Sequence, residues 1–492
     1  MVGLAAFRVS GDRGRLMQFI DVMRTRYVGL PGWVRRGLAP ALRLVPAELR
    51  YGETYGRMRG EIVRSRSDPA FVDARQTALL RRVLADAYRG SSYFRTVIDD
   101  RLGGAGGIAR AGREDLARLP VLDRYTMTEL ADDLCVMPPG RVDVKQTSGS
   151  TCHVPAKVFL DSDRSVRETA FVHGLWERVG FRAGDRILIV RDGNSYSFSA
   201  ERPWEVDHAL NELRLSPYHL VPETMDGHLA RIASWRPRII YGLPSALSIL
   251  ALHALGRNWS PPPGLAGVFT SSETLFEPQR EQISRAFGGV PVASYYGLTE
   301  RTAFAGEVPA APGIHEFEPL YGLTELVDVE GRPVTRPGEA GRIVSTGFLS
   351  RAMALLRYDT GDRARLVEAP RPGNCWRLRV SGIRSRWSQE FVVGSGGNPV
   401  SVLGLVSQNQ FGLIRTFQFR QEKAGHIVFA VVPCEGVRRR DLVPLVAQMR
   451  TELAGVLTVD LEIVDDIPAG PNGKRRLVDQ RLSLPGPCLV EV

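Results

Sequence analysis

Residues 267–297 have the sequence GVFTSSETLFEPQREQISRAFGGVPVASYYG, and this stretch decides the fold class. Its first four residues, GVFT, predict a short buried strand. Residues 278–287 then predict a helix, and residues 290–295 predict a second strand. Because strand, helix and strand follow one another directly, we expect an α/β fold in which helices pack against a layered sheet.

The chain before this stretch repeats the same alternation. Residues 186–190 (RILIV) and 238–241 (RIIY) predict two further buried strands. The turn Gly242-Leu243-Pro244 then leads into a predicted helix over 245–255. The repeated alternation indicates one large layered α/β domain.

The two ends of the chain have different patterns. Residues 71–87 have the apolar spacing of an amphipathic helix that Asp68-Pro69 would start, and the glycine cluster 103–107 (GGAGG) predicts a loop. A second glycine-rich stretch lies at 394–398 (GSGGN). After it, the patterns predict strands over 415–420 and 426–432, a helix over 441–453 and a strand over 458–464.

These patterns divide the chain into three expected parts. Residues 1–120 form a mostly helical region packed on the large domain, and residues 121–385 form the α/β core. Residues 386–492 form a small mobile α+β domain that carries Lys474. The length of 492 residues fits this division at roughly 100–200 residues per domain.

The composition is that of a globular chain, with 43% hydrophobic and 24% charged residues. The net charge is +10, and only four of the 64 basic residues are lysines: Lys145, Lys157, Lys423 and Lys474. The arginines are scattered and no nucleic-acid-binding motif accompanies them, so we expect a solvated basic surface and no nucleic-acid partner.

Several features indicate a cytoplasmic protein without a membrane partner. No apolar run approaches the ~20 residues of a membrane helix, and the N-terminus lacks a secretory signal. The five cysteines are widely spread, which is typical of reduced thiols rather than of a disulfide framework or a zinc site.

The strongest chemical signal is the loop Thr147-Ser148-Gly149-Ser150-Thr151. It follows the strand-like residues 141–144, and its backbone N–H groups and hydroxyls can surround phosphate oxygens. Ordinary turns use the same residue types, and the spacing is not that of a Walker loop. The loop alone therefore leaves the choice between a phosphate site and a turn open.

Three further segments favour the phosphate site. Residues 295–300 (YYGLTE) follow a predicted strand, and open α/β sheets bind ligands at the carboxyl ends of their strands. Residues 357–362 (RYDTGD) place Asp362 beyond a glycine turn, where its carboxylate could hold a ribose diol. Residues 468–474 place Lys474 on a Gly/Pro loop. Each segment alone could be a solvated turn, but their order along one chain indicates a nucleotide site.

With these motifs the chain resembles the adenylate-forming superfamily of acyl-CoA synthetases, adenylation domains and luciferases. Within it, the likeness is closer to the phenylacetate-CoA ligase, coenzyme F390 synthetase and CapK-like group, and it extends over about 51–482. The specific parts are TSGST at 147–151, YYGLTE at 295–300, RYDTGD at 357–362 and PNGK at 471–474. The resemblance implies the adenylate-forming fold, a cytoplasmic ligase, and use of ATP and Mg²⁺.

The resemblance also implies a role for individual residues. Lys474, Glu300 and Thr299 would be catalytic, with Glu300 as the Mg²⁺ ligand. The ATP site would comprise the loop 147–151 (Thr147, Ser148, Gly149, Ser150 and Thr151) together with Ser272, Glu273, Tyr296, Gly297, Asp362 and Arg384. By position between motifs, the acid pocket would draw on Tyr196, Phe198, His219, Tyr241 and Gly242. The aromatic rings among these would suit an aryl acid, or they are ordinary packing residues.

The chain departs from the family pattern at two places. The phosphate loop continues through 151–157 as TCHVPAK, so Cys152 replaces the usual glycine and one residue is added before Pro155. At the hinge, 381–387 read SGIRSRW, so Arg384 would serve as the motif arginine but the usual acid is missing. Because domain rotation switches the family between its two steps, the second step is the more affected.

The first hypothesis is thus an AMP-forming ligase that activates a small carboxylic acid as an acyl-adenylate. The acceptor would be coenzyme A, an amine or a hydroxyl. A rival hypothesis, based on Cys152 and the altered hinge, is a catalytically weakened nucleotide-binding relative. A third is an adenylyltransferase that acts on a hydroxyl group and leaves AMP in its product.

Overall fold

The computed structural model describes most of the chain beyond residue 50. The described residues are 34, 37, 51–146, 157–161, 164–191, 198–199, 201–273, 275, 277–308, 310–384, 391–402, 405, 413–434, 436–467 and 478–482. The helices are α3 (Gly52–Arg64), α4 (Pro69–Gly90), α5 (Ser92–Leu102), α6 (Gly104–Arg110), α7 (Arg124–Glu129), α8 (Arg164–Trp176), α9 (Pro222–Trp235), α10 (Pro244–Gly256), α11 (Glu277–Ala286) and α12 (Arg439–Glu452), with short 3-10 turns that include η4 (Glu177–Val179) and η5 (Pro217–His219). None of the described helices is both long enough and apolar enough to cross a membrane.

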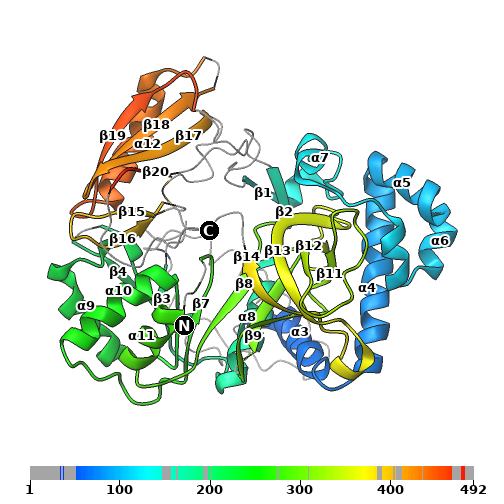
Figure 1. Ribbon diagram of the computed structural model, residues 1–492, viewed down its shortest axis with the longest axis horizontal. Helices are drawn as coiled ribbons and strands as arrows, with labels where there is room; N and C mark the ends of the chain where they lie inside the picture. Colours follow the sequence, from blue (N-terminus) through cyan, green and yellow to red (C-terminus); the bar gives the residue numbers. More distant parts are fainter. Residues whose placement is uncertain are drawn as a thin grey trace, which may run out of the picture.

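The strands form one large sheet and three small ones (Figure 1). They are β1 (Val142–Gln146), β2 (Lys157–Asp161), β3 (Ile187–Val190), β4 (Trp204–Asp207), β5 (Glu212–Leu215), β6 (Ile239–Gly242), β7 (Gly267–Thr270), β8 (Val292–Gly297), β9 (Phe304–Val308), β10 (Ala311–Phe317), β11 (Gly322–Val327), β12 (Ala340–Gly347), β13 (Tyr358–Glu368), β14 (Arg379–Arg384), β15 (Phe391–Val393), β16 (Pro399–Ser401), β17 (Ile414–Lys423), β18 (His426–Pro433), β19 (Thr458–Ile463) and β20 (Val478–Gln480). The large sheet has twelve strands in the order β11-β12-β13-β14-β10-β9-β8-β7-β6-β3-β5-β4.

Strand β8 joins two halves of this sheet that differ in strand direction. Its first residues pair with β7 in parallel, as Val292 does with Val268. Its last residues pair with β9 in antiparallel, as Tyr296 does with Ala305. The parallel neighbours β5, β3, β6 and β7 therefore lie on one side of β8, and an antiparallel half lies on the other.

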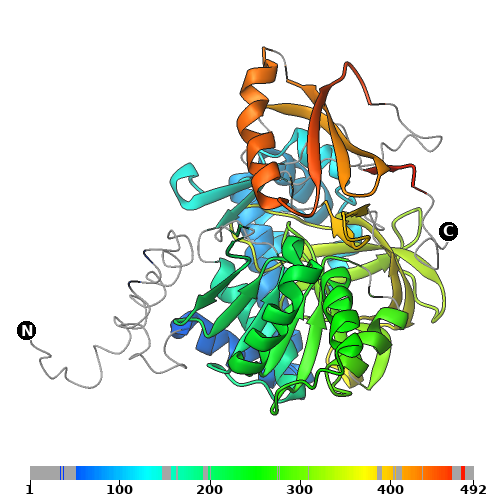
Figure 2. The same ribbon diagram turned by 90° about the vertical axis from the view of Figure 1, so that its left-hand side faces the viewer.

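Helices cover both faces of the parallel half. Every residue of β3, β6 and β7 is buried, as expected for strands between two helical layers. One face packs on α9, α10 and α11, which stand together in front of the sheet in Figure 2. The other face packs on α8, which in turn contacts α3. The layered α/β fold predicted from the sequence is confirmed.

The C-terminal part forms a separate sheet with the order β19-β18-β17-β20, and α12 packs on it. Figures 1 and 2 both show this unit at the top of the molecule, above the large sheet. Tyr218 of η5 packs into its apolar cluster beside residues such as Val392 and Val400. The strands and helix expected over 415–464 are present. The domain limits at 120 and 385 stay predictions.

The N-terminal helices confirm one local prediction and correct another. Asp68 caps α4, since its Oδ1 accepts a hydrogen bond from the Phe71 N–H at 2.8 Å, and Pro69 occupies the first turn. The glycine cluster 103–107, predicted as a loop, instead starts α6 directly after α5. Gly103 (φ 79°) turns the chain, and a Cβ on Gly107 would lie 1.7 Å from the Leu102 carbonyl oxygen. The glycines thus permit two helices to pack closely rather than form an extended connection.

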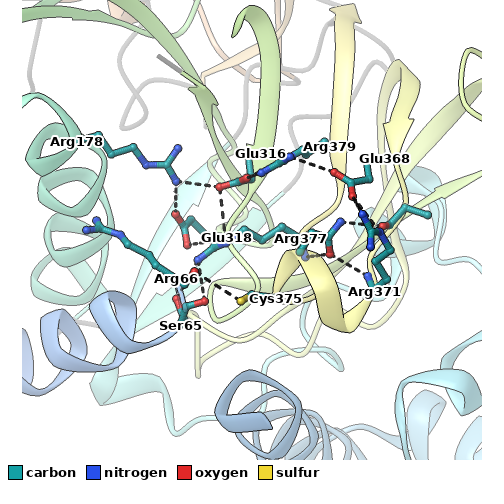
Figure 3. A network of polar contacts seen from close by, with 12 residues as sticks. Ser65, Arg66, Arg178, Glu316, Glu318, Glu368, Arg371, Cys375, Arg377 and Arg379 are labelled. Atoms are coloured by element: carbon teal, nitrogen blue, oxygen red, sulfur yellow. Dashed lines mark hydrogen bonds and ion pairs between the residues drawn. The ribbon is translucent and has the colours of Figure 1, made fainter. Parts of the chain in front are cut away.

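Part of the arginine surplus is structural rather than a solvated surface. Five described arginines are buried: Arg59, Arg124, Arg167, Arg357 and Arg377. Figure 3 shows the network around Arg377, whose Nη1 donates to Glu318 Oε2 at 2.8 Å and whose Nη2 donates to Ser65 Oγ at 3.0 Å. Arg178 contacts Glu318 at 3.1 Å from the other side. The network ties the end of α3 and η4 to the sheet.

The Glu318 carboxylate is the centre of this network. Burial alone would raise its pKa, but the Arg377 and Arg178 guanidinium groups outweigh burial and hold the pKa below its usual range. We expect Glu318→Gln to lower the free energy of unfolding by about 3 kcal/mol, because the buried Arg377 loses its shorter carboxylate contact and keeps only Glu316 at 3.6 Å. Chemical denaturation measures this change.

The matched control is Glu330→Gln, since the Glu330 side chain is 58% exposed and its ion-pair partner Arg332 is also exposed. This variant should shift the free energy of unfolding by less than about 0.5 kcal/mol. A depressed folded-state pKa stabilises the protein above the unfolded pKa of about 4.3, so the difference between wild type and Glu318→Gln should shrink as the pH falls below that value. Equal effects of the two variants at neutral pH would contradict the role of the network.

Candidate active site

The carboxyl ends of the parallel strands lie side by side at one edge of the large sheet. In register, Val190 of β3 lies beside Gly242 of β6, and Gly242 lies beside Thr270 of β7. Thr270 in turn pairs with Ser294 of β8. Ligands of open α/β sheets bind at this edge, so the residues that end or follow these strands are the candidates for a site.

Four polar side chains at this edge share one face of the sheet. Alternate residues of a strand point to the same side of the sheet. Arg191 and Ser271 therefore lie on the same side as Ile189 and Phe269, which precede them by two residues. Tyr241 pairs in register with both Ile189 and Phe269, and Tyr295 lies two residues beyond Ala293, the partner of Phe269. This side is the face of the sheet that packs on α8. We call Arg191, Tyr241, Ser271 and Tyr295 the strand-end cluster.

The Tyr241 hydroxyl is the hub of the strand-end cluster. It accepts hydrogen bonds from the Tyr295 hydroxyl and from Arg191 Nη1, and it lies 2.8 Å from Ser271 Oγ. The rings of Tyr241 and Tyr295 stack with their centroids 5.5 Å apart. Burial and the neighbouring Tyr241 raise the pKa of Tyr295 well above its usual range, so its hydroxyl remains a proton donor at neutral pH.

The two motifs YYGLTE and RYDTGD are joined by two crossed hydrogen bonds. The Tyr296 hydroxyl donates to Asp362 Oδ2 at 2.6 Å, and the Tyr358 hydroxyl donates to Glu300 Oε1 at 3.0 Å. Each motif thus supplies one tyrosine and, four residues later, one carboxylate. Burial and the Asp362 carboxylate raise the pKa of Tyr296 well above its usual range. The crossed pairs fix the predicted adenine, ribose and metal residues in one place.

These bonds require the antiparallel half of the sheet to curl. Strand β13 carries Tyr358 and Asp362, and it is the fourth strand from β8 in the sheet order. A flat sheet would keep the two strands far apart, because neighbouring strands are about 4.8 Å apart. Strand β12 also returns to the connection between β8 and β9, where Ser345 Oγ donates to the Thr302 carbonyl at 2.8 Å. The curl brings the second motif back over the strand ends.

Glu300 is buried and lies beside a cation. Arg124 of α7 donates from Nη1 to Glu300 Oε1 at 3.2 Å, and both side chains are less than 10% exposed. Within the described part of the chain, no group of three or more His, Cys, Asp or Glu could hold a metal ion. Mg²⁺ in phosphoryl-transfer sites often takes only one or two carboxylates and completes its shell with water and phosphate oxygens. A single carboxylate at Glu300 fits that pattern.

Backbone strain surrounds the site. Ser272 follows β7 with φ 72°, Arg301 follows Glu300 with φ 58°, and Arg357 precedes β13 with φ 44°. A positive φ is unfavourable for residues other than glycine, and such residues concentrate at functional sites. Arg357 is held in place by two contacts: its Nε lies 3.1 Å from Glu325 Oε2, and its Nη1 donates to the Leu119 carbonyl oxygen at 2.7 Å. These contacts anchor the first residue of the RYDTGD motif and so position the rest of it.

The remaining nucleotide-site predictions lie at the same strand edge or on β14. Ser272 Oγ lies 3.5 Å from both Ser271 Oγ and Arg191 Nη2, and Glu273 follows it. Gly297 ends β8 and is exposed, as is Thr299 two residues later. Arg384 is exposed at the end of β14, in register with Arg363 of β13.

The predicted acid-pocket residues are less closely grouped. Tyr241 belongs to the strand-end cluster, and a Cβ on Gly242 would lie 2.6 Å from the Val190 carbonyl oxygen, so close strand packing requires this glycine. His219 is buried in η5 beyond β5, where its Nδ1 lies 2.7 Å from Ser216 Oγ. Burial, with a smaller effect of His228, lowers the pKa of His219 and favours its neutral form. Phe198 is half-buried.

Several predicted residues lie outside the described residues and stay predictions. They are Lys474, Tyr196 and the loop residues Thr147, Ser148, Gly149, Ser150 and Thr151. Cys152 and the hinge residues 385–387 also lie outside.

The sequence did not single out Arg191, Arg124 or Tyr358. Arg191 directly follows the predicted strand 186–190, so its place at the sheet edge was readable from the sequence. Because it is one of many scattered arginines, its residue type alone did not indicate a functional role. Arg124 and Tyr358 reach Glu300 across 176 and 58 residues of chain, a distance over which no local pattern extends.

Comparison with known proteins agrees with the motifs. Residues 399–481 match a family model described as the CapK C-terminal domain. Protein CapK of Staphylococcus aureus is 24% identical over 370 residues, which are 74% of this chain and 79% of CapK. A phenylacetate-coenzyme A ligase of Thermus thermophilus is 27% identical over 300 residues, which are 59% of this chain and 64% of that ligase.

Solved structures show the same fold. A 2-hydroxyisobutyryl-CoA ligase in the thioesterification state superposes with a TM-score of 0.54, at 19% identity over 85% of this chain and 92% of that one. The same ligase in the postadenylation state gives a TM-score of 0.52. The fold, the motifs and the relatives together confirm the predicted resemblance of this chain to the CapK-like group of adenylate-forming enzymes.

Proposed function

We propose that the protein is an ATP- and Mg²⁺-dependent, AMP-forming ligase that activates a carboxylic acid as an acyl-adenylate. The observation that carries the proposal is the pair of crossed hydrogen bonds, Tyr296 to Asp362 and Tyr358 to Glu300. They hold the two motifs together at the carboxyl edge of the sheet, where such sheets bind ligands.

The first step needs stabilisation of negative charge around the phosphates rather than a general base. A carboxylic acid is already ionised at neutral pH, so one of its oxygens can attack the α-phosphorus directly. The bond from that phosphorus to the bridging oxygen breaks, and pyrophosphate leaves with the electron pair. The difficulty is that an anion approaches a triphosphate, so the protein must stabilise negative charge in the transition state.

The chain supplies the groups for this task. The flat ring of Tyr296 would stack on adenine, and Asp362 would accept hydrogen bonds from the ribose hydroxyls. Glu300 would hold Mg²⁺, which neutralises phosphate charge when bound, and the exposed Thr299 would contact the α-phosphate. The loop 147–151 would surround the other phosphates. Lys474 would bring a compact ammonium group to the α-phosphate, which the planar fork of arginine does not reproduce.

The second step transfers the acyl group to coenzyme A or to an amine or hydroxyl. Relatives named as coenzyme A ligases support a thioester-forming step.

The two rival hypotheses predict different experimental results. A weakened relative would be protected by ATP without turnover, and restoring Cys152→Gly would then raise its activity. An adenylyltransferase would retain AMP in its product.

The Glu300 carboxylate is expected to act on Mg²⁺ in addition to its ion pair. We expect Glu300→Gln to lower acid-dependent pyrophosphate release by about 100-fold, because a neutral amide is a poorer ligand for a hard cation. The matched control is Arg124→Gln, which breaks the same buried ion pair but keeps the carboxylate. Pyrophosphate release at varied Mg²⁺ concentration, with melting temperatures of both variants, measures the difference. Equal losses in the two variants would contradict a metal role for Glu300.

Lys474 is expected to be essential for adenylation but not for ATP binding. Lys474→Ala should abolish pyrophosphate release, while ATP should still raise the melting temperature, since most nucleotide contacts remain. Lys423→Ala is the control, because Lys423 is the one lysine that lies neither in nor near a motif segment, at the end of β17. Substantial release by Lys474→Ala would refute the assignment. If no acid in a broad panel gives pyrophosphate and ATP leaves the melting temperature unchanged, the proposed function itself fails.

A further inference from the structure

The strand-end cluster places a guanidinium group and three hydroxyls where the acid would lie. We propose that the protein prefers a short acid with a second carboxylate, and that Arg191 pairs with this remote carboxylate. The inference rests on the proposed function and names the substrate class of that site. It departs from the aryl acid that the aromatic residues had suggested.

The bottom of this site is filled by aromatic side chains. Trp176 of α8 is 3% exposed and Phe269 of β7 is 1% exposed. Their ring centroids are 6.1 Å apart, and the Trp176 and Tyr241 centroids are 5.8 Å apart. Rings in contact fill the space between them, as in a close-packed protein interior. A long apolar or aryl acyl group that extends below the strand-end cluster would have to displace these rings.

The top of the same site is polar. The Tyr241, Ser271 and Tyr295 hydroxyls meet there, and the Tyr241 and Ser271 side chains are buried. Arg191 Nη1 donates to the Tyr241 hydroxyl and lies 3.4 Å from Ser271 Oγ. Its Nη2 lies 3.5 Å from Ser272 Oγ. An apolar acyl group over the cluster would remove water from the partly exposed Arg191 and return no hydrogen bond, which is unfavourable. An acid with a second polar end would replace the lost water.

A carboxylate is the polar end that suits this arrangement best. The guanidinium group matches a carboxylate through two parallel N–H···O bonds, and hydroxyl donors can complete the shell. Arg191 follows β3, but its guanidinium group reaches Ser271 and Ser272 after β7, the strand next to β8. Thr299 and Glu300 follow β8 directly, so the reacting carboxylate near Thr299 and the remote one near Arg191 would lie about one strand spacing apart, a separation that suits a short diacid. The cluster is a specificity element, and the chemistry occurs at the other end of the acid.

Matched pairs of acids test this assignment. Succinate and glutarate are compared with their monoamides, succinamate and glutaramate, which have the same length but a neutral remote end. Benzoate and hexanoate represent aryl and apolar acids. Acid-dependent pyrophosphate release gives kcat and KM for each acid. The wild-type protein should prefer a diacid over its monoamide by about 100-fold in kcat/KM, the scale expected when a site is built for a specific polar group.

Variants of Arg191 separate a specificity role from a structural one. Arg191→Gln should lower kcat/KM at least tenfold for the diacid but leave the monoamide unchanged or improved, mainly through KM. Arg191→Lys should keep part of the preference, because it retains the charge without the fork. The control is Arg336→Gln, whose side chain is 85% exposed and should leave the preference intact.

The outcomes also distinguish this inference from the proposed function. Preference for benzoate or hexanoate over both diacids overturns the substrate class but leaves the AMP-forming ligase standing. An equal loss for diacids and monoamides in Arg191→Gln overturns the remote pairing, because Arg191 would then act on the reacting carboxylate or on folding. Absence of pyrophosphate with every acid rejects the proposed function, and the inference fails with it.

Discussion

The two crossed hydrogen bonds between tyrosines and carboxylates are the constraint on which the site depends. Tyr296 with Asp362 and Tyr358 with Glu300 join a strand of the parallel half to a strand that lies far away in the sheet order. Buried hydroxyls and carboxylates are costly without partners, so the antiparallel half must curl until each finds its own. The curl of the antiparallel half and the geometry of the site therefore depend on the same four side chains.

Strand β8 makes this possible, because it pairs in parallel at its start and in antiparallel at its end. The parallel part gives an edge at which strand ends converge, and the antiparallel part supplies the strands that return over it. Buried arginines hold this arrangement from outside the site. Arg377 binds Glu318 and the end of α3, and Arg357, the first residue of the second motif, binds Glu325. The arginine surplus has a structural component that composition alone did not reveal.

The sequence predicted what is local. The strands over 186–190, 238–241 and 267–270 were recognisable because buried parallel strands are short continuous apolar runs. The cap of α4 was recognisable because Asp68-Pro69 acts within one turn. The loop predicted for the glycine cluster 103–107 was wrong, because glycines suit both a loop and a close contact between helices. Only the position of Leu102 in the folded chain decides between the two. Arg191 and Tyr358 were missed because their partners lie at least 50 residues away in the chain. The roles of Lys474 and the loop 147–151 stay predictions.

The proposed ligase activity requires that a carboxylate oxygen of the acid attacks the α-phosphorus of ATP. An acid labelled with ¹⁸O in its carboxylate tests this most directly, with the nucleotide products analysed by mass spectrometry after transfer to hydroxylamine. We expect AMP and pyrophosphate, with one ¹⁸O atom carried into AMP, because the acyl carbon–oxygen bond breaks when the acceptor attacks. ADP with labelled inorganic phosphate, or AMP without label, would contradict it.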